Sequence, residues 1–301
     1  MVKETVYNQS KAQQRHPRFG ANVLVRNYWI RHAQKISGEI TNTEGNAWSS
    51  SSISKHGAKS AKKYGEAITA SKDGAKGYVS SSMRTLQTLE KIFEGYKQTN
   101  PDKPIYPARV VKELGSEAVP EFLTLYNLKF IMHRKKILEQ RKILESNFAF
   151  LTPDEQEEIA ELAEEPVMRE WLDNPSSELA RLLPPQQAAA RFARLFSRRH
   201  EKLVTKLHSG SEMDLFHVTH KTITEPFLVS GVLVRKTDKK RITGLEQLGG
   251  SLKILEDWQS IITTDRFGNL NVVVKFRGEE YEIDWQILES LLTISLKNNK
   301  T

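Results

Sequence analysis

The sequence predicts an α/β protein, folded as a three-layer α/β/α sandwich with a mostly parallel sheet and a helical insertion. Short β-branched and aromatic runs alternate with helical patterns along the chain. Residues 121–205 break this alternation with long helical patterns and few strand signals. The composition, 38% hydrophobic and 27% charged over 301 residues, is that of a globular protein with a sizeable core. Such alternation is typical of a sheet covered by helices on both faces.

The elements before residue 120 follow from local patterns. Residues 1–21 have the composition of a polar arm, and residues 22–30 (NVLVRNYWI) predict the first strand. Ser54 is the expected N-cap of a helix that runs to about residue 70, and Ser82 precedes a second helix. Two further strands are expected at 77–80 and 105–111. The predicted order is therefore strand, helix, strand, helix, strand.

The segment at about 120–185 is predicted to be a helical cap, inserted into one domain that spans residues 22–301. A helical pattern covers residues 123–144. Thr152-Pro153-Asp154-Glu155 then has the form of a capping box with proline at the first helical position. The acidic helix that follows is expected to expose its glutamates to solvent, because most charge runs are solvated. These are Glu157, Glu158, Glu161, Glu164 and Glu165.

Beyond the insertion the alternation of helices and strands resumes. A helix is predicted at 186–207, a strand at 214–218 and a helix at about 222–234. A hairpin is expected from residues 259–264 and 270–276 around Phe267-Gly268-Asn269.

Cysteine content, hydropathy and charge exclude several classes of protein. Without Cys there is no disulfide framework, thiolate nucleophile or Cys-ligated metal. No run reaches the roughly 18–20 apolar residues of a membrane span. The N-terminus lacks the apolar stretch of a signal peptide, so a cytoplasmic protein without a membrane partner is expected. The formal net charge of +8 favours anionic partners. The basic loop 235–241 has no interleaved aromatic residues, which argues against nucleic acid.

Basic and polar residues follow three of the predicted strands. Arg31-His32 comes after the first strand, Ser80 to Arg84 after the second, and Thr219-His220 after the late one. In open α/β sheets, ligands bind beyond the carboxyl ends of the strands, so these loops are expected to line one crevice. Two Arg and two His side chains there suit a phosphoryl group. A histidine in such a pocket can also attack phosphorus as a nucleophile.

These segments resemble the motifs of the histidine phosphatase superfamily, also called phosphoglycerate mutase-like. Residues 28–33 (YWIRHA) resemble its Arg-His-Gly signature, and residues 53–57 (ISKHG) its "L-T-x-x-G" segment. Residues 79–88 (VSSSMRTLQT) resemble its "S-S-x-x-R-x-x-Q-T" motif, and residues 216–220 (FHVTH) its late strand ending in Thr-His. The four motifs stand in the family's order, over residues 22–119 and 186–277. The resemblance implies a phosphoglycerate mutase-like fold.

The resemblance also implies roles for the residues in these motifs. His32 would be the nucleophile that forms a phosphohistidine. Arg31, Arg84 and His220 would surround the phosphoryl group and stabilise the charge that builds on its oxygens. Such a reaction uses no metal and no cofactor.

A general acid is implied as well. Members related to phosphoglycerate mutase use a Glu shortly after the third strand, and residues 111–115 (VKELG) resemble that region, which selects Glu113, with Glu117 as the second choice. Its carboxyl would need a pKa raised toward neutrality. Two positions depart from the pattern, since Ala33 and Lys221 stand where glycine is usual. Lys221 could narrow the pocket or bind a second anionic group of the substrate.

The predicted activity is hydrolysis of a small-molecule or protein phosphomonoester through a phosphohistidine on His32. Two alternatives stay open. One is a mutase of the same superfamily, which would move a phosphoryl group between two positions of one substrate. The other is a module on the same fold that binds a phosphate or a partner without catalysis. The helices of the insertion would select the substrate, whose identity, like the oligomeric state, has no signal in the sequence.

Overall fold

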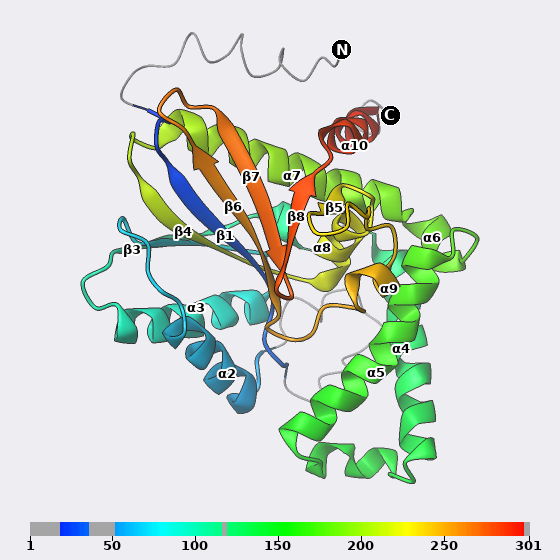
Figure 1. The fold of residues 1–301 in the computed structure, drawn as a ribbon. Coiled ribbons are helices and arrows are strands. Elements are labelled where there is room, and N and C mark those ends of the chain that lie inside the picture. Colours follow the sequence, from blue (N-terminus) through cyan, green and yellow to red (C-terminus); the bar gives the residue numbers. More distant parts are fainter. Residues whose placement is uncertain (1–18, 36–51, 116–118, 298–301) are drawn as a thin grey trace.

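The computed structural model describes residues 19–35, 52–115 and 119–297, so most of the predicted polar arm lies outside it. The described strands form one sheet in the order β3-β2-β4-β1-β6-β7-β8-β5 (Figure 1). The strands are β1 Leu24–Arg31, β2 Ala75–Val79, β3 Ile105–Val110, β4 Glu212–Thr219, β5 Leu233–Arg235, β6 Asp257–Thr264, β7 Leu270–Phe276 and β8 Glu279–Ile283.

The sheet has a parallel half and an antiparallel half. Strands β3, β2, β4 and β1 run parallel, and these are the strands that carry the predicted motifs. Strands β6, β7, β8 and β5 continue from β1 in antiparallel pairs, and the predicted hairpin is β6-β7. The segments 265–269 and 277–278 are too short for a parallel crossover. The prediction of a mostly parallel sheet therefore holds for one half only, and the sheet as a whole is mixed.

The predicted helices are present, with one correction to their bounds, whereas α9 and α10 were not predicted. They are α2 Lys55–Glu66, α3 Met83–Thr99, η2 Lys112–Leu114, α4 Pro120–Gln140, η3 Glu145–Phe150, α5 Pro153–Asp173, α6 Glu178–Leu182, α7 Pro185–Lys206, α8 Lys221–Leu228, α9 Leu245–Leu248 and α10 Trp285–Lys297. The helix predicted at 222–234 is too long, because α8 ends at Leu228 and the chain turns at Gly231 into strand β5. None of the described helices is long and apolar enough to cross a membrane.

Both faces of the sheet are covered, which confirms the predicted three-layer sandwich. Side chains alternate between the faces along β1. Tyr28 and Ile30 join the apolar cluster of α2 and α3, whereas Val25 and Trp29 join the cluster of α7, α8 and α10. The strand is therefore buried on both sides, and the apolar run Tyr28 to Ile30 packs against both clusters.

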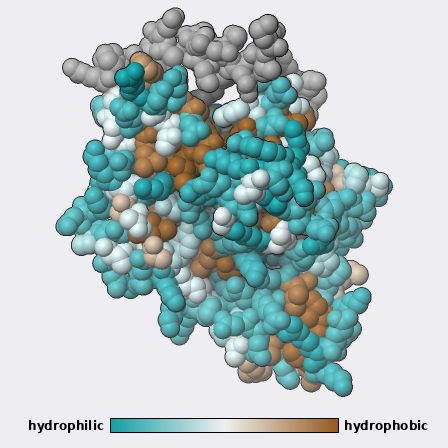
Figure 2. All heavy atoms as spheres, viewed as in Figure 1, coloured by the Kyte–Doolittle hydropathy of each residue, from teal (hydrophilic) through white to brown (hydrophobic). Residues whose placement is uncertain are grey.

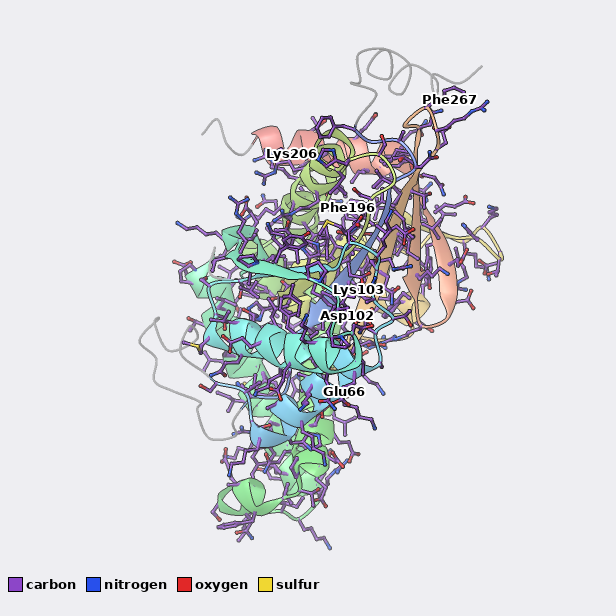
Figure 3. All side chains as sticks on the ribbon, turned by 90° about the vertical axis from the view of Figure 1, so that its left-hand side faces the viewer. Glu66, Asp102, Lys103, Phe196, Lys206 and Phe267 are labelled. Carbon is purple, nitrogen blue, oxygen red and sulfur yellow. The ribbon has the colours of Figure 1, made fainter. Side chains whose placement is uncertain are left out.

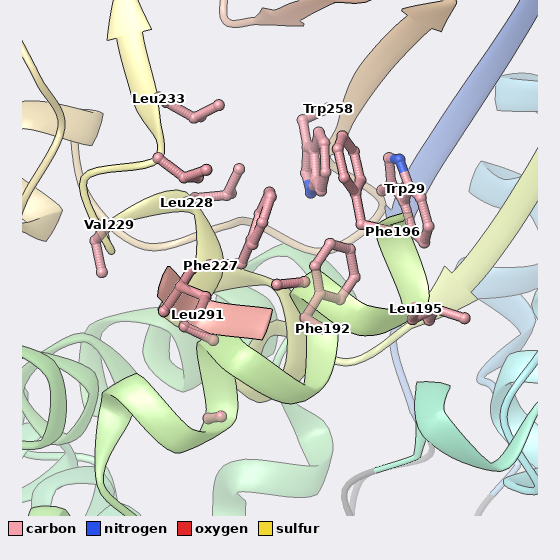
Figure 4. Packing of buried hydrophobic residues seen from close by; sticks show 14 of the residues in the cluster. Trp29, Phe192, Leu195, Phe196, Phe227, Leu228, Val229, Leu233, Trp258 and Leu291 are labelled. Carbon is pink, nitrogen blue, oxygen red and sulfur yellow. The ribbon is translucent and has the colours of Figure 1, made fainter. Parts of the chain in front are cut away.

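Aromatic rings form the centre of the second cluster (Figure 4). Trp29 of β1 lies edge to face with Phe192 of α7, with ring centroids 4.9 Å apart, and Phe196 lies 5.1 Å from Phe227 of α8. Trp258 of β6 stacks 5.4 Å from Trp29. This packing fixes α7 and α8 against β1, and with them the loop at the end of β4.

Helices α2 and α3 approach each other closely at two glycines. A Cβ atom on Gly65 would lie 2.0 Å from the carbonyl oxygen of Ile92, and one on Gly95 would lie 1.9 Å from that of Lys62. No other residue type fits between these backbones without moving a helix. Helix α2 begins at the predicted N-cap, where Ser54 Oγ accepts a hydrogen bond from the amide of Gly57.

Helices α4 and α5, joined by η3, extend from the body as an arm (Figures 1 and 3). The capping box predicted at Thr152 is confirmed, since the Thr152 hydroxyl accepts from the Glu155 amide while the Glu155 carboxylate accepts from the Thr152 amide. The end of the arm carries exposed apolar side chains, including Met132, Leu144 and Phe150, and hydrophobic residues gather over this part of the surface in Figure 2.

Candidate active site

Strands β1, β2 and β4 bring their following loops to one edge of the sheet. Arg31 at the end of β1 pairs with Thr219 of β4, and Val79 at the end of β2 pairs with Val218. The amide of His32 donates to the Thr219 carbonyl at 3.0 Å, which places His32 directly beside the chain that leads to His220. The three predicted loops therefore meet at the carboxyl ends of parallel strands.

The two histidines face each other, with ring centroids 5.0 Å apart and planes at 64°. His32 Nδ1 lies 2.8 Å from the carbonyl oxygen of Ala33. A carbonyl oxygen can only accept, so Nδ1 carries the proton and Nε2 of the neutral ring keeps a free lone pair. The backbone after β1 thus selects the tautomer that a nucleophilic histidine needs.

Arg84, at the start of α3, fixes the other histidine. Its Nη2 lies 3.2 Å from His220 Nδ1, and a guanidinium can only donate, so His220 Nδ1 accepts. The proton of the neutral His220 ring is then on Nε2, 3.3 Å from Ser80 Oγ. Thr85 Oγ1 lies 2.9 Å from Ser80 Oγ and donates to the carbonyl of Ser82 at 2.7 Å. The loop after β2 therefore holds both Arg84 and the ring of His220.

Burial and neighbouring cations keep both histidines neutral. Burial lowers the pKa of His32 well below its usual value of 6.5, and the charges of Arg84 and Arg31 lower it further. Burial and the same two arginines lower the pKa of His220. At neutral pH the lone pair of His32 Nε2 is therefore free to form a bond.

Arg31 and Lys221 bind a carboxylate from the arm. Arg31 Nη2 lies 2.8 Å from Glu164 Oε2, and Lys221 Nζ lies 2.9 Å from the same oxygen. The hydroxyl of Tyr126 in α4 donates to Glu164 Oε1 at 2.8 Å, and Arg31 Nη1 donates to the carbonyl of Leu252 at 2.6 Å. Burial raises the pKa of Glu164, but Lys221 and Arg31 outweigh it and lower the pKa to about 2. Glu164 is therefore ionised at neutral pH.

The structure brings five of the sequence-predicted residues together and places the sixth elsewhere. Arg31, His32, Arg84, His220 and Lys221 share this edge of the sheet. Glu113 is not part of this cluster. Its carboxylate lies on η2, 45% exposed, and pairs with Arg198 of α7 at 2.9 Å.

The choice of Glu113 as general acid is also unsupported by its environment. Burial raises the pKa of Glu113, but hydrogen bonds from its own backbone and from Arg198 lower it overall, which is opposite to what a general acid needs. The cation of this ion pair, Arg198, comes from helix α7. The second choice, Glu117, lies outside the described residues.

The acidic helix is not simply solvated, so that prediction is wrong for part of it. Glu164 binds Arg31 and Lys221, Glu161 accepts from the amide of Ile254 at 3.1 Å, and Glu165 accepts from the amide of Ser251 at 3.0 Å. These carboxylates hold α5 against the body. The sequence contains one relevant signal, since Glu164 follows Ala163 at the border of the apolar face of α5.

Glu225 of α8 is a second buried carboxyl that the sequence motifs do not include. Its Oε1 accepts from Ser251 Oγ at 2.7 Å and from the amide of Leu252 at 2.5 Å. Within the described part of the chain, Oε2 has no hydrogen-bond partner. Burial raises the pKa of Glu225 to about 7, against the opposing effects of Lys221, the two hydrogen bonds and Arg31. Near neutral pH this group is therefore only partly ionised.

We expect Glu225 to make the protein less stable as the pH rises. The unfolded chain releases the Glu225 proton near its usual pKa of 4.5, whereas the folded chain keeps it up to about 7. Between these values the folded state binds more protons, so stability falls with pH, by up to about 3 kcal/mol. In Glu225→Gln this loss should disappear, as urea denaturation at about pH 5 and 8 would measure. The exposed Glu289→Gln should keep the wild-type pH dependence, and equal pH slopes for all three proteins would contradict the prediction.

Among the described residues, no group of three or more His, Cys, Asp or Glu side chains is arranged to hold a metal ion. The site is instead rich in cations, since Arg31, Arg84 and Lys221 are all buried, with exposed fractions of 7%, 4% and 4%. Buried cations of this kind need an anionic partner. The arrangement can therefore bind an oxyanion next to a neutral, correctly oriented histidine.

No model of a known protein family and no curated protein matches the sequence. A solved phosphoglycerate mutase from Bacillus anthracis is similar over 90% of this chain and 98% of its own, at 14% identity and a TM-score of 0.40. A mycobacterial glucosyl-3-phosphoglycerate phosphatase is similar over 83% of this chain and 97% of its own, at 12% identity and a TM-score of 0.40. A structure described as mycobacterial hydrolase 2 is similar over 90% of this chain and 98% of its own, at 11% identity and a TM-score of 0.42.

Proposed function

We propose that this protein is a phosphatase of the histidine phosphatase superfamily, which hydrolyses a phosphomonoester through a phosphohistidine on His32. The observation that carries the proposal is the state of His32. Its Nδ1 proton is held by the Ala33 carbonyl, which leaves the lone pair on Nε2, and burial together with the charges of Arg84 and Arg31 lowers its pKa well below the usual value. A neutral imidazole beside guanidinium groups is suited to attack a phosphate ester, because the cations neutralise the charge that repels a nucleophile.

The proposed reaction has two displacements at phosphorus. In the first, the lone pair of His32 Nε2 forms a bond to phosphorus, the bond to the ester oxygen breaks, and that oxygen takes up a proton. In the second, water attacks phosphorus and gives up one proton while the phosphorus–nitrogen bond breaks, which releases inorganic phosphate and restores His32. This proton replaces the one that the ester oxygen took up. The sum is the consumption of one water molecule, so no oxidant, reductant or other reactant is needed.

The surrounding residues take different parts in this proposal. Arg84 binds the phosphoryl oxygens, and His220 Nδ1 holds the Arg84 guanidinium in place. The Nε2 proton of His220, which faces Ser80, is the ring donor for a phosphoryl oxygen. Arg31 and Lys221 supply further positive charge. Together they favour the transition state, in which charge is spread over the equatorial oxygens.

Rapid-quench labelling tests this function directly. Wild-type protein mixed with a phosphomonoester that carries labelled phosphorus should form a labelled protein whose bond is labile to acid and stable to base, as expected for phosphohistidine. His32→Ala should form none. Absence of label in the wild type, or equal label in the variant, would overturn the proposal.

The same experiment separates the two alternatives from a phosphatase. A mutase would transfer the label between two positions of one substrate, whereas a phosphatase releases it as inorganic phosphate. A module that binds without catalysis would form no labelled protein and release no phosphate while still binding the substrate. A screen of sugar phosphates, nucleotides, phosphoproteins and lipid phosphates, with His32→Ala in parallel, would identify the substrate class.

A further inference from the structure

Glu164 occupies the position that an anionic ligand would take between Arg31 and Lys221. One oxygen, Oε2, accepts from Arg31 Nη2 at 2.8 Å and from Lys221 Nζ at 2.9 Å, and the other accepts from the Tyr126 hydroxyl at 2.8 Å. These donors come from β1, α8 and α4. A guanidinium and an ammonium that converge on one oxygen form a site for a carboxylate or a phosphoryl oxygen alike.

A phosphate dianion cannot share this position with Glu164. Both anions would compete for the same two cations, and the repulsion between them would be strong because the site is buried. Lys221 also lies 3.0 Å from Ser251 Oγ, so it keeps a neutral partner when the carboxylate leaves. Binding of an anion to Arg31 and Lys221 therefore requires Glu164 to withdraw.

The half of α5 that carries Glu164 buries Ile159 and Ala163, which belong to neither apolar cluster of the sheet, and it reaches the body through polar contacts. Asp154 pairs with His56 of α2 at 3.4 Å, and the Pro153 carbonyl accepts from Gln34 Nε2 at 2.7 Å. Glu161 accepts from the Ile254 amide. A cavity of about 410 Å³ lies between α2, α5 and residues 253–255, so this half of the helix is not closely packed on α2.

The other half of α5 is anchored in the core. Val167, Met168 and Trp171 are all buried in the cluster that includes Phe122 of α4. Pro166 separates the two halves, and a proline inside a helix removes one backbone hydrogen bond and lowers the resistance to bending. The helix can therefore release its charged half while its apolar half stays in place.

We propose that Glu164 is a built-in competitor of phosphate, which closes the anion site in the free protein and is displaced from Arg31 and Lys221 when a phosphorylated substrate binds. The inference rests on the proposed function for the identity of the anion, and it makes the arm a lid that opens on binding. It also predicts that the lid lowers the affinity for phosphate rather than raising it.

The affinity of Glu164→Gln for inorganic phosphate tests this inference. Glutamine keeps the shape of the side chain and can still accept from Tyr126, but it removes the competing charge. We expect the Kd of phosphate, measured by calorimetry, to fall by on the order of tenfold. Glu158→Gln is the matched control, because Glu158 lies on the same helix but pairs with Arg141 within the arm. Its Kd should equal that of the wild type.

Thermal unfolding keeps the test informative if the variant is unstable. Without phosphate, Glu164→Gln should unfold at a lower temperature than the wild type, because Arg31 and Lys221 lose their counter-ion. Added phosphate should raise the Tm of the variant more than that of the wild type, since ligand binding stabilises by an amount that grows as Kd falls. Glu164→Asp, which keeps the charge, should bind phosphate no more tightly than the wild type.

The outcomes distinguish this inference from the proposed function. A Kd that is unchanged or higher in Glu164→Gln would overturn the inference, even if the wild type forms a phosphohistidine. A lower Kd in a protein that forms no labelled intermediate would support the competitor role and refute the phosphatase. The Kd of phosphate and the phosphate-induced shift of Tm both report binding at equilibrium, so neither measurement depends on turnover.

Discussion

Replacement of His32 by alanine is expected to lower the rate of phosphate release by roughly four to six orders of magnitude. The variant keeps Arg31, Arg84 and His220, so it can still bind a phosphorylated substrate. It lacks the nitrogen that attacks phosphorus, and water would have to attack the ester directly. Steady-state release of inorganic phosphate measures the effect, with single-turnover measurements to show that substrate still binds.

His208→Ala is the matched control for this substitution. His208 is an exposed histidine just before β4, at the opposite end of that strand from His220, and its ring stacks on Phe19. Its loss should leave the rate of phosphate release unchanged. If His32→Ala kept a tenth or more of the wild-type rate with a normal Tm, His32 would not be the nucleophile.

The parallel half of the fold could be predicted from the sequence because its signals are local. The apolar run before Arg31 forms β1, Ser54 caps α2 as its sequence position indicates, and the capping box at Thr152 starts α5. Because the site residues stand directly at the ends of β1 and β4, predicting these strands also predicts where the residues lie. Their convergence needs only the rule that parallel strands present their carboxyl ends at one edge.

The antiparallel half was less predictable. Strand β5 has only three residues, and β8 reads EEYEI, a sequence in which glutamates conceal the alternation of Tyr281 and Ile283 toward the core. Helix α10 packs on α7, a contact between distant parts of the chain that no local pattern encodes.

The partners of charged side chains were harder to predict from the sequence, as Glu113 and the acidic helix α5 show. Glu113 matches a family motif, but α7 supplies Arg198, and the carboxylate pairs with this distant partner. Glu164 stands in a run of glutamates, and its place beside Ala163 at the border of the apolar face is a weak signal that does not identify its partners. Only the packing of α5 on the body brings this one to Arg31 and Lys221. Ion pairs between an insertion and its domain depend on tertiary structure, not on local sequence.

Arg84→Gln is expected to lower kcat/KM by about 10²- to 10³-fold. Arg84 is buried beside His220. Burial lowers the pKa of Arg84 to about 10, with Glu164 opposing this effect and Arg31 adding to it, so Arg84 is charged at neutral pH. Removing this charge takes away stabilisation of the equatorial oxygens. Arg84→Lys should recover part of the loss, because it restores the charge but not the planar fork that reaches both His220 and the phosphoryl group.

The pH profile of Arg84→Gln distinguishes loss of this charge from a merely structural effect. Because Arg84 lowers the pKa of His32, its removal should raise that pKa. His32 must be unprotonated to attack, so the acid limb of kcat/KM should move to higher pH in the variant, measured between about pH 4 and 8. Arg198→Gln, which removes a surface guanidinium paired with Glu113, should change neither the rate nor the limb. A large drop in rate with an unshifted acid limb would mean that Arg84 supports the loop after β2 and does not act on the nucleophile through its charge.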